Sequence, residues 1–164
     1  MTDLSAYRNV KHQVGYCGIW CGSCVVGNGA LRELAERFES MLEAYRFPEW
    51  APKNFNYEEF SSGLVAIRHL PLCPGCLKGG GREECPLRGC ATRRKIDSCT
   101  KCAGFVGCPH GELLGHMRSG ATAAGLFVLA VEREAAGFVR NSEAALKSRW
   151  PSSILFTSGL QAGE

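Results

Sequence analysis

The sequence predicts a mainly α-helical protein, a helical domain interrupted by an irregular, cysteine-rich part with little or no β-structure. Three observations lead to this expectation. Apolar residues recur at three- and four-residue spacing in several stretches, as on one face of a helix. No stretch of any length alternates apolar and polar residues as a half-buried strand would. The ten cysteines lie in segments rich in glycine and proline, which favour turns. We expect residues 1–164 to form a single domain.

The first two helices are predicted over residues 28–46 and 57–70. Asn28 and Asn56 can cap their N-termini, and Pro48 follows closely on the end of the first. Each helix has one apolar stripe at helical spacing, which we expect to be buried. The stripe of the first consists of Leu31, Leu34, Ala35, Phe38, Met41, Leu42 and Tyr45, and that of the second of Phe60, Leu64 and Ile67.

Residues 111–150 are predicted to be helical as well, in three pieces at about 111–117, 121–136 and 142–150. The middle piece is apolar around most of its circumference. It would therefore be a central helix in a monomer, or the buried helix of a homodimer.

The composition favours a cytoplasmic protein. The longest apolar run, residues 123–131, has about half the length that a membrane span needs, so no membrane association is expected. The first residues lack the apolar region of a secretory signal. In a reducing compartment, ten clustered cysteines indicate metal ligation or redox chemistry more than disulfides. The alternative is that they are small buried apolar residues.

The cysteine-rich part comprises about residues 15–27 and 71–110. Two C-x2-C pairs, Cys73/Cys76 and Cys99/Cys102, stand 22 residues apart, close to the spacing of a two-knuckle, four-thiolate zinc site. We therefore expect these four thiols to bind one metal ion, most simply zinc. The irregular segment would then be metal-stapled, that is, held in its fold by the bound metal. Few large apolar residues lie between 71 and 110, so metal should be a condition for that segment to fold.

The N-terminal cluster has the spacing C-x3-C-x2-C, formed by Cys17, Cys21 and Cys24. These thiols are expected beside Cys85, Cys90 or Cys108, in a second site that His110 could complete. The same spacing holds the four-iron cluster of radical S-adenosylmethionine enzymes. Those enzymes need a βα barrel, for which this chain has neither length nor strands. An iron–sulfur cluster without radical chemistry stays open.

These motifs resemble a named family, the domain of unknown function 3795 family. The resemblance covers about residues 15–110. It is carried, in order, by the motifs YCGIWCGSC (16–24), CPGC (73–76), CPLRGCA (85–91) and CTKC (99–102), and by Cys108. The family pattern usually has isoleucine where this chain has Leu87, and an aromatic-Pro-Cys sequence where it has GFVGCPH. Members are presumed to bind zinc or an iron–sulfur cluster. The resemblance implies metal binding and no particular activity.

Three function classes follow. The first is a zinc-stapled structural or interaction module of unknown biochemical role. The second is an iron–sulfur redox protein or enzyme. The third is a nucleic-acid-binding zinc protein, suggested by the basic run 93–95 and disfavoured because no aromatic residues interleave with that run. The sequence shows no recognisable catalytic constellation, so it does not decide whether the protein is an enzyme, and it identifies no partner.

Overall fold

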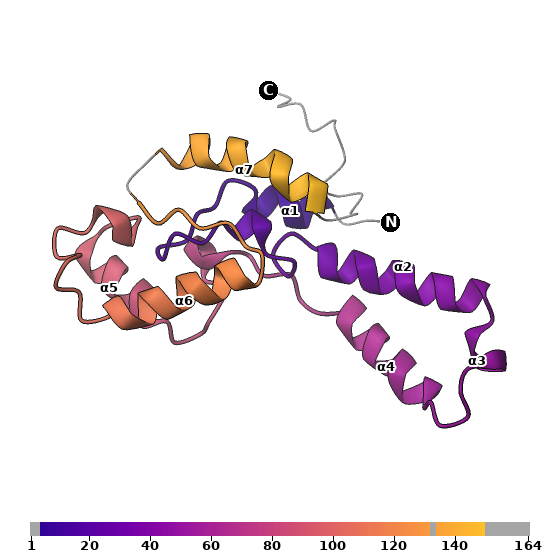
Figure 1. Ribbon diagram of the computed structural model, residues 1–164. Helices are drawn as coiled ribbons and strands as arrows, with labels where there is room; N and C mark the ends of the chain where they lie inside the picture. Colours follow the sequence, from indigo (N-terminus) through magenta and orange to yellow (C-terminus); the bar gives the residue numbers. More distant parts are fainter. Residues whose placement is uncertain (1–3, 132–133, 150–164) are drawn as a thin grey trace.

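Two groups of helices lie on either side of an irregular centre in the computed structural model (Figure 1), which describes residues 4–131 and 134–149. Helices α2, α3 and α4 project to one side as an arm. Helices α5 and α6 lie on the other side, and α1 and α7 lie together above the centre. The N-terminal loop after α1 runs through the middle. The helices, three of them short 3₁₀ turns (η), are α1 (Leu4–Val10), η1 (Cys21–Ser23), α2 (Ala30–Ala44), α3 (Phe47–Trp50), α4 (Tyr57–Arg68), η2 (Cys76–Lys78), α5 (Pro86–Arg94), η3 (Cys99–Lys101), α6 (Gly111–Ala123) and α7 (Ala135–Arg149).

The mainly helical fold class is confirmed. Among the described residues, extended pairing is limited to two isolated bridges, Val14 with Trp20 and Ile19 with Val128. The first two predicted helices are present as α2 and α4. Asn56 caps α4 by accepting a hydrogen bond from the backbone N–H of Glu59 at 3.1 Å. Asn28 supports the start of α2 from one position earlier than a true cap, because its Oδ1 accepts from the N–H of Ala30.

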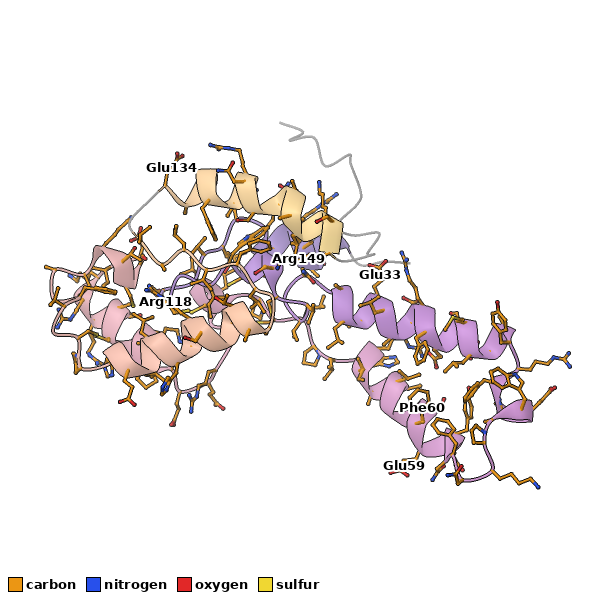
Figure 2. The ribbon with its side chains drawn as sticks, in the orientation of Figure 1. Glu33, Glu59, Phe60, Arg118, Glu134 and Arg149 are labelled. Carbon is orange, nitrogen blue, oxygen red and sulfur yellow. The ribbon has the colours of Figure 1, made fainter. Side chains whose placement is uncertain are left out.

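The arm has a core of its own, made of the predicted stripes of α2 and α4. Leu42 and Leu64 are buried between the two helices, and the ring of Phe60 meets that of Phe38 edge-on at 6.0 Å. Phe60 faces α2 in Figure 2. The arm therefore does not depend on the cysteine-rich part for its packing. The residues of this core are Ala35, Leu42, Leu64, Phe47, Tyr57, Phe60 and Ile67.

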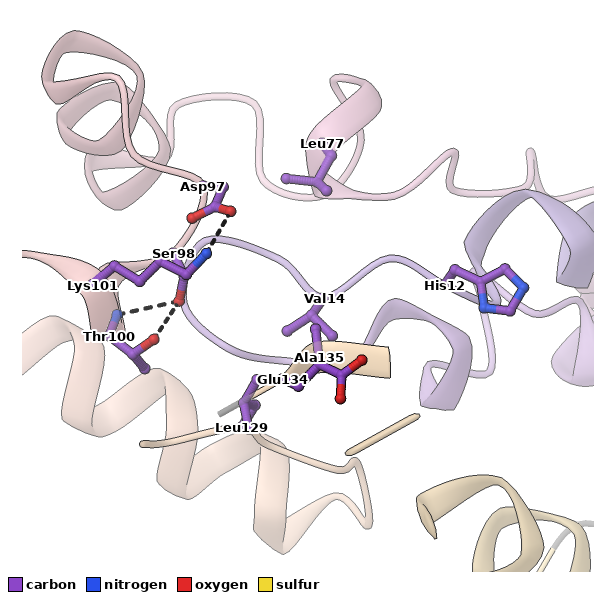
Figure 3. A pocket seen from close by; sticks show the side chains of 10 residues that line it. All are labelled: His12, Val14, Leu77, Asp97, Ser98, Thr100, Lys101, Leu129, Glu134 and Ala135. Carbon is purple, nitrogen blue, oxygen red and sulfur yellow. Dashed lines mark hydrogen bonds and ion pairs between the residues drawn. The ribbon is translucent and has the colours of Figure 1, made fainter. Parts of the chain in front are cut away.

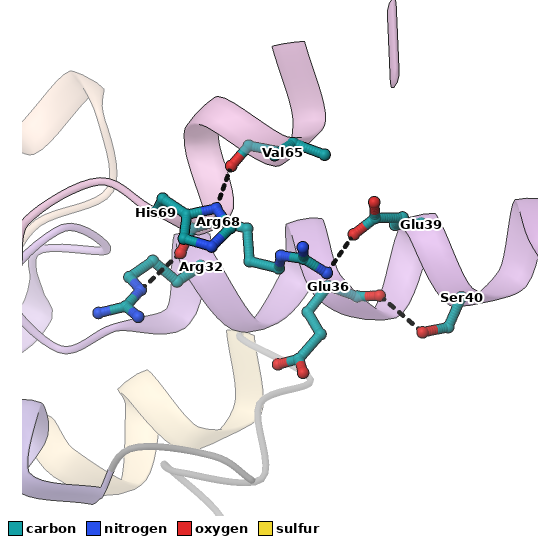
Figure 4. A network of polar contacts seen from close by, with 7 residues as sticks. All are labelled: Arg32, Glu36, Glu39, Ser40, Val65, Arg68 and His69. Atoms are coloured by element: carbon teal, nitrogen blue, oxygen red, sulfur yellow. Dashed lines mark hydrogen bonds and ion pairs between the residues drawn. The ribbon is translucent and has the colours of Figure 1, made fainter. Parts of the chain in front are cut away.

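Polar contacts close the base of the arm, where α4 returns to α2 (Figure 4). Arg32 Nε donates to the carbonyl of Arg68 at 2.8 Å, and the Arg68 guanidinium binds the Glu39 carboxylate at 2.7 Å. The imidazole of His69 lies 2.8 Å from the carbonyl of Val65. Because Glu39 is mostly buried and Arg68 only part exposed, this ion pair is better protected from solvent than a surface pair.

A second core joins the N-terminal loop to α1 and α7. Tyr7, Trp20, Val139 and Leu146 are each almost fully buried in it, and Phe127 packs against it. The Trp20 indole donates its N–H to the carbonyl of Lys11 at 2.7 Å, so its one polar atom is satisfied inside the core.

The third predicted helical region is correct at its ends and wrong in its middle. Helix α6 runs on to Ala123, and α7 begins at Ala135. The described residues between them, 124–131 and 134, are not helical. Gly125 leaves the helix with a φ of +79°. The chain then pairs with the N-terminal loop, where Trp20 N–H donates to Phe127 O and Leu129 N–H to Gly18 O. The apolar helix on which the homodimer expectation rested therefore does not form.

Three α-helices lie outside the predicted ranges. Helices α1 and α3 stand before and after the first predicted range, and α5 lies within 71–110, for which an irregular segment is predicted. Helix α5 begins with Pro86 in its first turn, and its only buried residues, Leu87 and Ala91, are four apart. This one-turn repeat was too short to stand out from the surrounding cysteines. None of the described helices is long and apolar enough to cross a membrane.

Gly18 should be one of the least replaceable positions of the fold. It has a φ of +93°, and an added Cβ would lie 2.2 Å from the carbonyl oxygen of Leu129. We expect Gly18→Ala to lower the free energy of unfolding by at least about 1–3 kcal/mol, from backbone strain alone. Urea denaturation followed by circular dichroism measures this difference.

Gly63→Ala is the matched control. Gly63 lies inside α4, where an added Cβ would meet no other atom within 4 Å. This substitution should raise the stability by about 0.5–1 kcal/mol. Equal stability of the two variants would show that the loop does not approach residue 129 as described.

Candidate functional site

The N-terminal loop presents Cys17, Cys21 and Cys24 along one side. The loop folds back on itself where Gly15 N–H donates to Ile19 O at 2.9 Å. The turn η1 follows, closed by a bond from Cys24 N–H to Cys21 O at 3.1 Å. Ser23 is buried and both accepts from Phe127 N–H and donates to Trp20 O. The three cysteines thus lie on a loop whose backbone is fixed by hydrogen bonds within the loop and to Phe127.

The first C-x2-C knuckle lies directly against this loop. Asn9 and Gln13 both donate side-chain N–H groups to the carbonyl of Pro74, at 3.1 and 3.0 Å. A Cβ on Gly15 would lie 3.3 Å from the Cβ of Cys76. Inside the knuckle, Gly81 N–H donates to the Sγ of Cys73 at 3.2 Å. A backbone N–H aimed at sulfur is the usual support for a metal-binding thiolate.

Six cysteines line one cavity of about 220 Å³ between the loop, the knuckle and the start of α5. The walls beside the sulfurs are mostly apolar, with Met117 of α6 and Leu126 among them, and Arg82 and Arg88 complete the rim. We call this space the thiol cavity. Its cysteines are Cys17, Cys21, Cys24, Cys73, Cys76 and Cys85.

Burial favours the protonated form of three of these thiols, those of Cys17, Cys21 and Cys76, in the metal-free chain. It raises the pKa of Cys17 and Cys76, and it raises that of Cys21 to about 11. Neighbouring thiols add to the effect, since the charges of Cys76, Cys73 and Cys17 all act on Cys21. Backbone N–H groups lower the pKa of the same three thiols in part, and the charge of Arg88 lowers that of Cys76. A metal that binds here must therefore displace protons.

The other four cysteines, Cys90, Cys99, Cys102 and Cys108, lie outside the thiol cavity. The Cys99/Cys102 knuckle thus does not line the cavity that Cys73 and Cys76 line, and the expectation that the two knuckles share one ion stays a prediction. The expected approach of the N-terminal cysteines to Cys85 is present, because all four line the cavity. Within residues 4–131 and 134–149, no three His, Cys, Asp or Glu side chains are grouped so as to hold a metal ion.

The histidines stand apart from the thiol cavity. His110 precedes α6 and lines an open surface pocket of about 820 Å³, which it shares with Cys85 and Arg93. His116 is exposed on α6, and His69 is engaged at the base of the arm. None of these three lines the thiol cavity, although His110 shares its own pocket with Cys85, one of the six cysteines.

A further pocket of about 570 Å³ has mixed polar and apolar walls and carries no comparable chemistry (Figure 3). Lys101 binds Asp97 at 2.8 Å, and the hydroxyls of Ser98 and Thr100 lie 2.7 Å apart. Ser98 also accepts from Thr100 N–H, so it caps η3. These groups satisfy one another and hold the turn that carries Cys99. We see in them a structural role.

Comparisons with known proteins give one match. Residues 13–112 match the model of a family described as "Protein of unknown function (DUF3795)". The matched range contains all ten cysteines and the whole arm. No curated protein and no solved structure matches the chain.

The pKa of Cys21 can be tested directly by alkylation. Because only the thiolate reacts, the rate for Cys21 in the reduced, metal-free protein should rise about tenfold per pH unit from 8 to 10, without levelling off. Peptide mass spectrometry after short iodoacetamide pulses measures the rate residue by residue.

The same cysteine in the denatured chain is the control. There its pKa returns to the ordinary range, so the rate should level off near pH 9. A folded-state profile that levels off at the same pH would show that Cys21 is not buried among other thiols.

Proposed function

The chain belongs to the domain of unknown function 3795 family, and we propose that it is an iron–sulfur protein whose cluster is held in the thiol cavity. One observation carries this proposal. Thiols from three separate segments line a single cavity with mostly apolar walls. Cysteine thiolates are the usual ligands of iron–sulfur clusters.

The size of the cavity favours a cluster over a single ion. In a four-thiolate zinc site the sulfurs stand about 2.3 Å from the metal and surround it completely. The thiol cavity has a volume of about 220 Å³, roughly that of seven water molecules at ~30 Å³ each. A group of several iron and sulfide atoms fits such a space better than one ion does.

The number and spacing of the thiols suit the same group. Clusters of two or four irons take four cysteines, and six are at hand. Cys17, Cys21 and Cys24 have the C-x3-C-x2-C spacing known from one class of four-iron site, and the opposite wall offers Cys73, Cys76 and Cys85. We expect three ligands from the loop and one from that wall.

The surroundings would support the charge of thiolate ligands. The Arg88 guanidinium donates to three backbone carbonyls, those of Gly80, Arg82 and Glu83, so it is fixed beside the cavity. It already favours the thiolate form of Cys76. When bound, a cluster accepts and donates single electrons, which makes a redox role the natural one. The chain's own part is to orient the thiols, balance their charge and exclude water.

A zinc-stapled structural module is the second candidate, because each C-x2-C knuckle has the form found in zinc sites. Anaerobic purification separates the two. An iron–sulfur protein is brown and contains iron and acid-labile sulfide in equal amounts. A colourless, iron-free protein with zinc in the thiol cavity would overturn the proposal in favour of the zinc module.

Removing two cavity ligands should abolish the cluster. We expect Cys21→Ser with Cys73→Ser to lose the visible absorbance and all bound iron, because one ligand from each wall is gone. Iron and sulfide analysis with an absorption spectrum measures this. The control is Cys102→Ser with Cys108→Ser, which leaves the cavity intact. If the control loses its iron as completely as the cavity variant, the cluster is not confined to the thiol cavity.

A further inference from the structure

Three arginines and a histidine line one open pocket beside the start of α5. Its volume is about 820 Å³, within the range usual for small-molecule sites, and we call it the arginine pocket. Arg82 comes from the segment before α5, Arg88 and Arg93 come from α5 itself, and His110 directly precedes α6. Basic side chains from separate segments thus face one space. The lining also includes Glu83, Glu84, Cys85, Gly89 and Thr92.

Arg88 is the fixed part of the pocket wall. Its half-buried guanidinium donates to three backbone carbonyls, which use three of its five N–H groups. Within residues 4–131 and 134–149, no carboxylate forms an ion pair with it. The group therefore keeps its charge and its place before any ligand arrives, and a donor that is already ordered loses less entropy on binding.

Arg82 and Arg93 supply the adjustable part of the wall. Both side chains are exposed, and neither forms an ion pair with a carboxylate in the part of the chain that the structure describes. The guanidinium of Arg93 lies back along α5, since a Cβ added at Gly89 would be 3.5 Å from its Nη1. Because Gly89 has no side chain, the wall leaves space beside this guanidinium.

We propose that the arginine pocket binds a small molecule that carries a phosphate group. Guanidinium groups bind phosphate oxygens through charge-assisted hydrogen bonds, often two at a time. A phosphate ester has three free oxygens, so it can accept from all three arginines at once, whereas a carboxylate has only two. The hydroxyl of Thr92 is a further donor in the same lining.

The charge of the surroundings favours an anion of limited size. Residues 73–108 contain seven Lys and Arg against three Asp and Glu, a net charge of +4 that attracts anions. Glu83 and Glu84 line the pocket as well, and they would repel the continuous phosphate backbone of a nucleic acid. A small ligand can turn hydroxyl or amino groups toward these carboxylates. The pocket therefore suits a phosphorylated metabolite better than a polynucleotide.

The arginine pocket shares part of its wall with the thiol cavity. Arg82, Cys85 and Arg88 line both spaces. A ligand in the pocket would thus lie next to Cys85, one of the six thiols of the cavity. The inference does not depend on a bound cluster, because the groups that would hold the phosphate are arginines and a hydroxyl.

Isothermal titration of the full chain with pyrophosphate tests the proposal. We expect saturable binding at a single site. Arg93→Gln should weaken this binding about tenfold or more, because a charged hydrogen bond is lost. Lys95→Gln is the matched control, since it removes the same charge at the end of the same helix from a side chain that does not line the pocket. The control should bind within about twofold of the unchanged protein, because salt screens an exposed charge.

Three results would overturn the proposal. The first is the absence of saturable binding at millimolar pyrophosphate. The second is equal weakening by Arg93→Gln and Lys95→Gln, which would show that net charge and not the pocket attracts the anion. The third is a different preference among anions, namely equal binding of the dicarboxylate malonate or tighter binding of a single-stranded DNA oligomer at physiological salt.

Chemical modification of arginine locates the ligand without any variant. Phenylglyoxal modifies accessible guanidinium groups, and peptide mass spectrometry measures the rate for each arginine. Pyrophosphate should slow the modification of Arg82 and Arg93 and leave that of Arg46, which is exposed on the arm, unchanged. Unchanged rates at Arg82 and Arg93 in saturating pyrophosphate would overturn the site, whether or not the thiol cavity contains iron.

Discussion

Burial of the Trp20 indole, which has no exposed surface, holds the N-terminal loop in the shape that sets Cys17, Cys21 and Cys24 on one wall. The ring is fixed from several directions. Its N–H binds the carbonyl of Lys11, and Gly22 lies so close that an added Cβ would stand 2.7 Å from the indole. The backbone N–H of the same residue reaches Phe127. One residue thus joins the start of the chain to its last third through its side chain and its backbone, and it fixes the loop that carries Cys17, Cys21 and Cys24.

The thiols pose an electrostatic problem that this loop cannot solve alone. Six sulfurs cannot all ionise in a mostly apolar cavity without a large electrostatic cost, and the raised pKa values of Cys17, Cys21 and Cys76 express that cost. A metal centre bound there would replace the protons, and its positive charge would offset the repulsion among the thiolates. The cavity and its proposed occupant therefore depend on each other. The protein supplies geometry and fixed donors, and the metal would supply the charge that lets the sulfurs remain together.

Sequence patterns were sufficient to predict the helical class, the two main helices of the arm and the extent of the cysteine-rich segments. They did not show how these parts of the chain pack against one another. A C-x2-C spacing predicts that two thiols converge, but it does not indicate which other segment of the chain lies beside them. The partners of Cys73 and Cys76 are decided by Asn9 and Gln13, whose bonds to Pro74 hold the knuckle against the N-terminal loop. Ordinary polar residues 61 to 65 positions away give no local signal of such a contact.

The apolar run at 126–131 shows the same limit in another form. A short apolar stretch fits a buried helix and a buried extended segment equally well. The choice was made by tertiary bonds to Gly18 and Trp20 and by the left-handed turn at Gly125. Which six of the ten cysteines share the thiol cavity was likewise beyond the sequence, because the spacing of cysteines along the chain does not show which segments pack together.

The arm also bears on how the protein can fold. Cys24 and Cys73 lie on the same cavity, although the whole of α2, α3 and α4 separates them in the chain. If that stretch were slack, closing it would cost conformational entropy that grows with its length. A hairpin that packs by itself, fastened at its base by Arg32 and Arg68, brings its two ends together beforehand. The shortening of the effective loop saves about 1–2 kcal/mol of closure entropy. The arm thus holds the segments that carry Cys24 and Cys73 close together. If it forms early in folding, the two sides of the cavity need only a short further movement to meet.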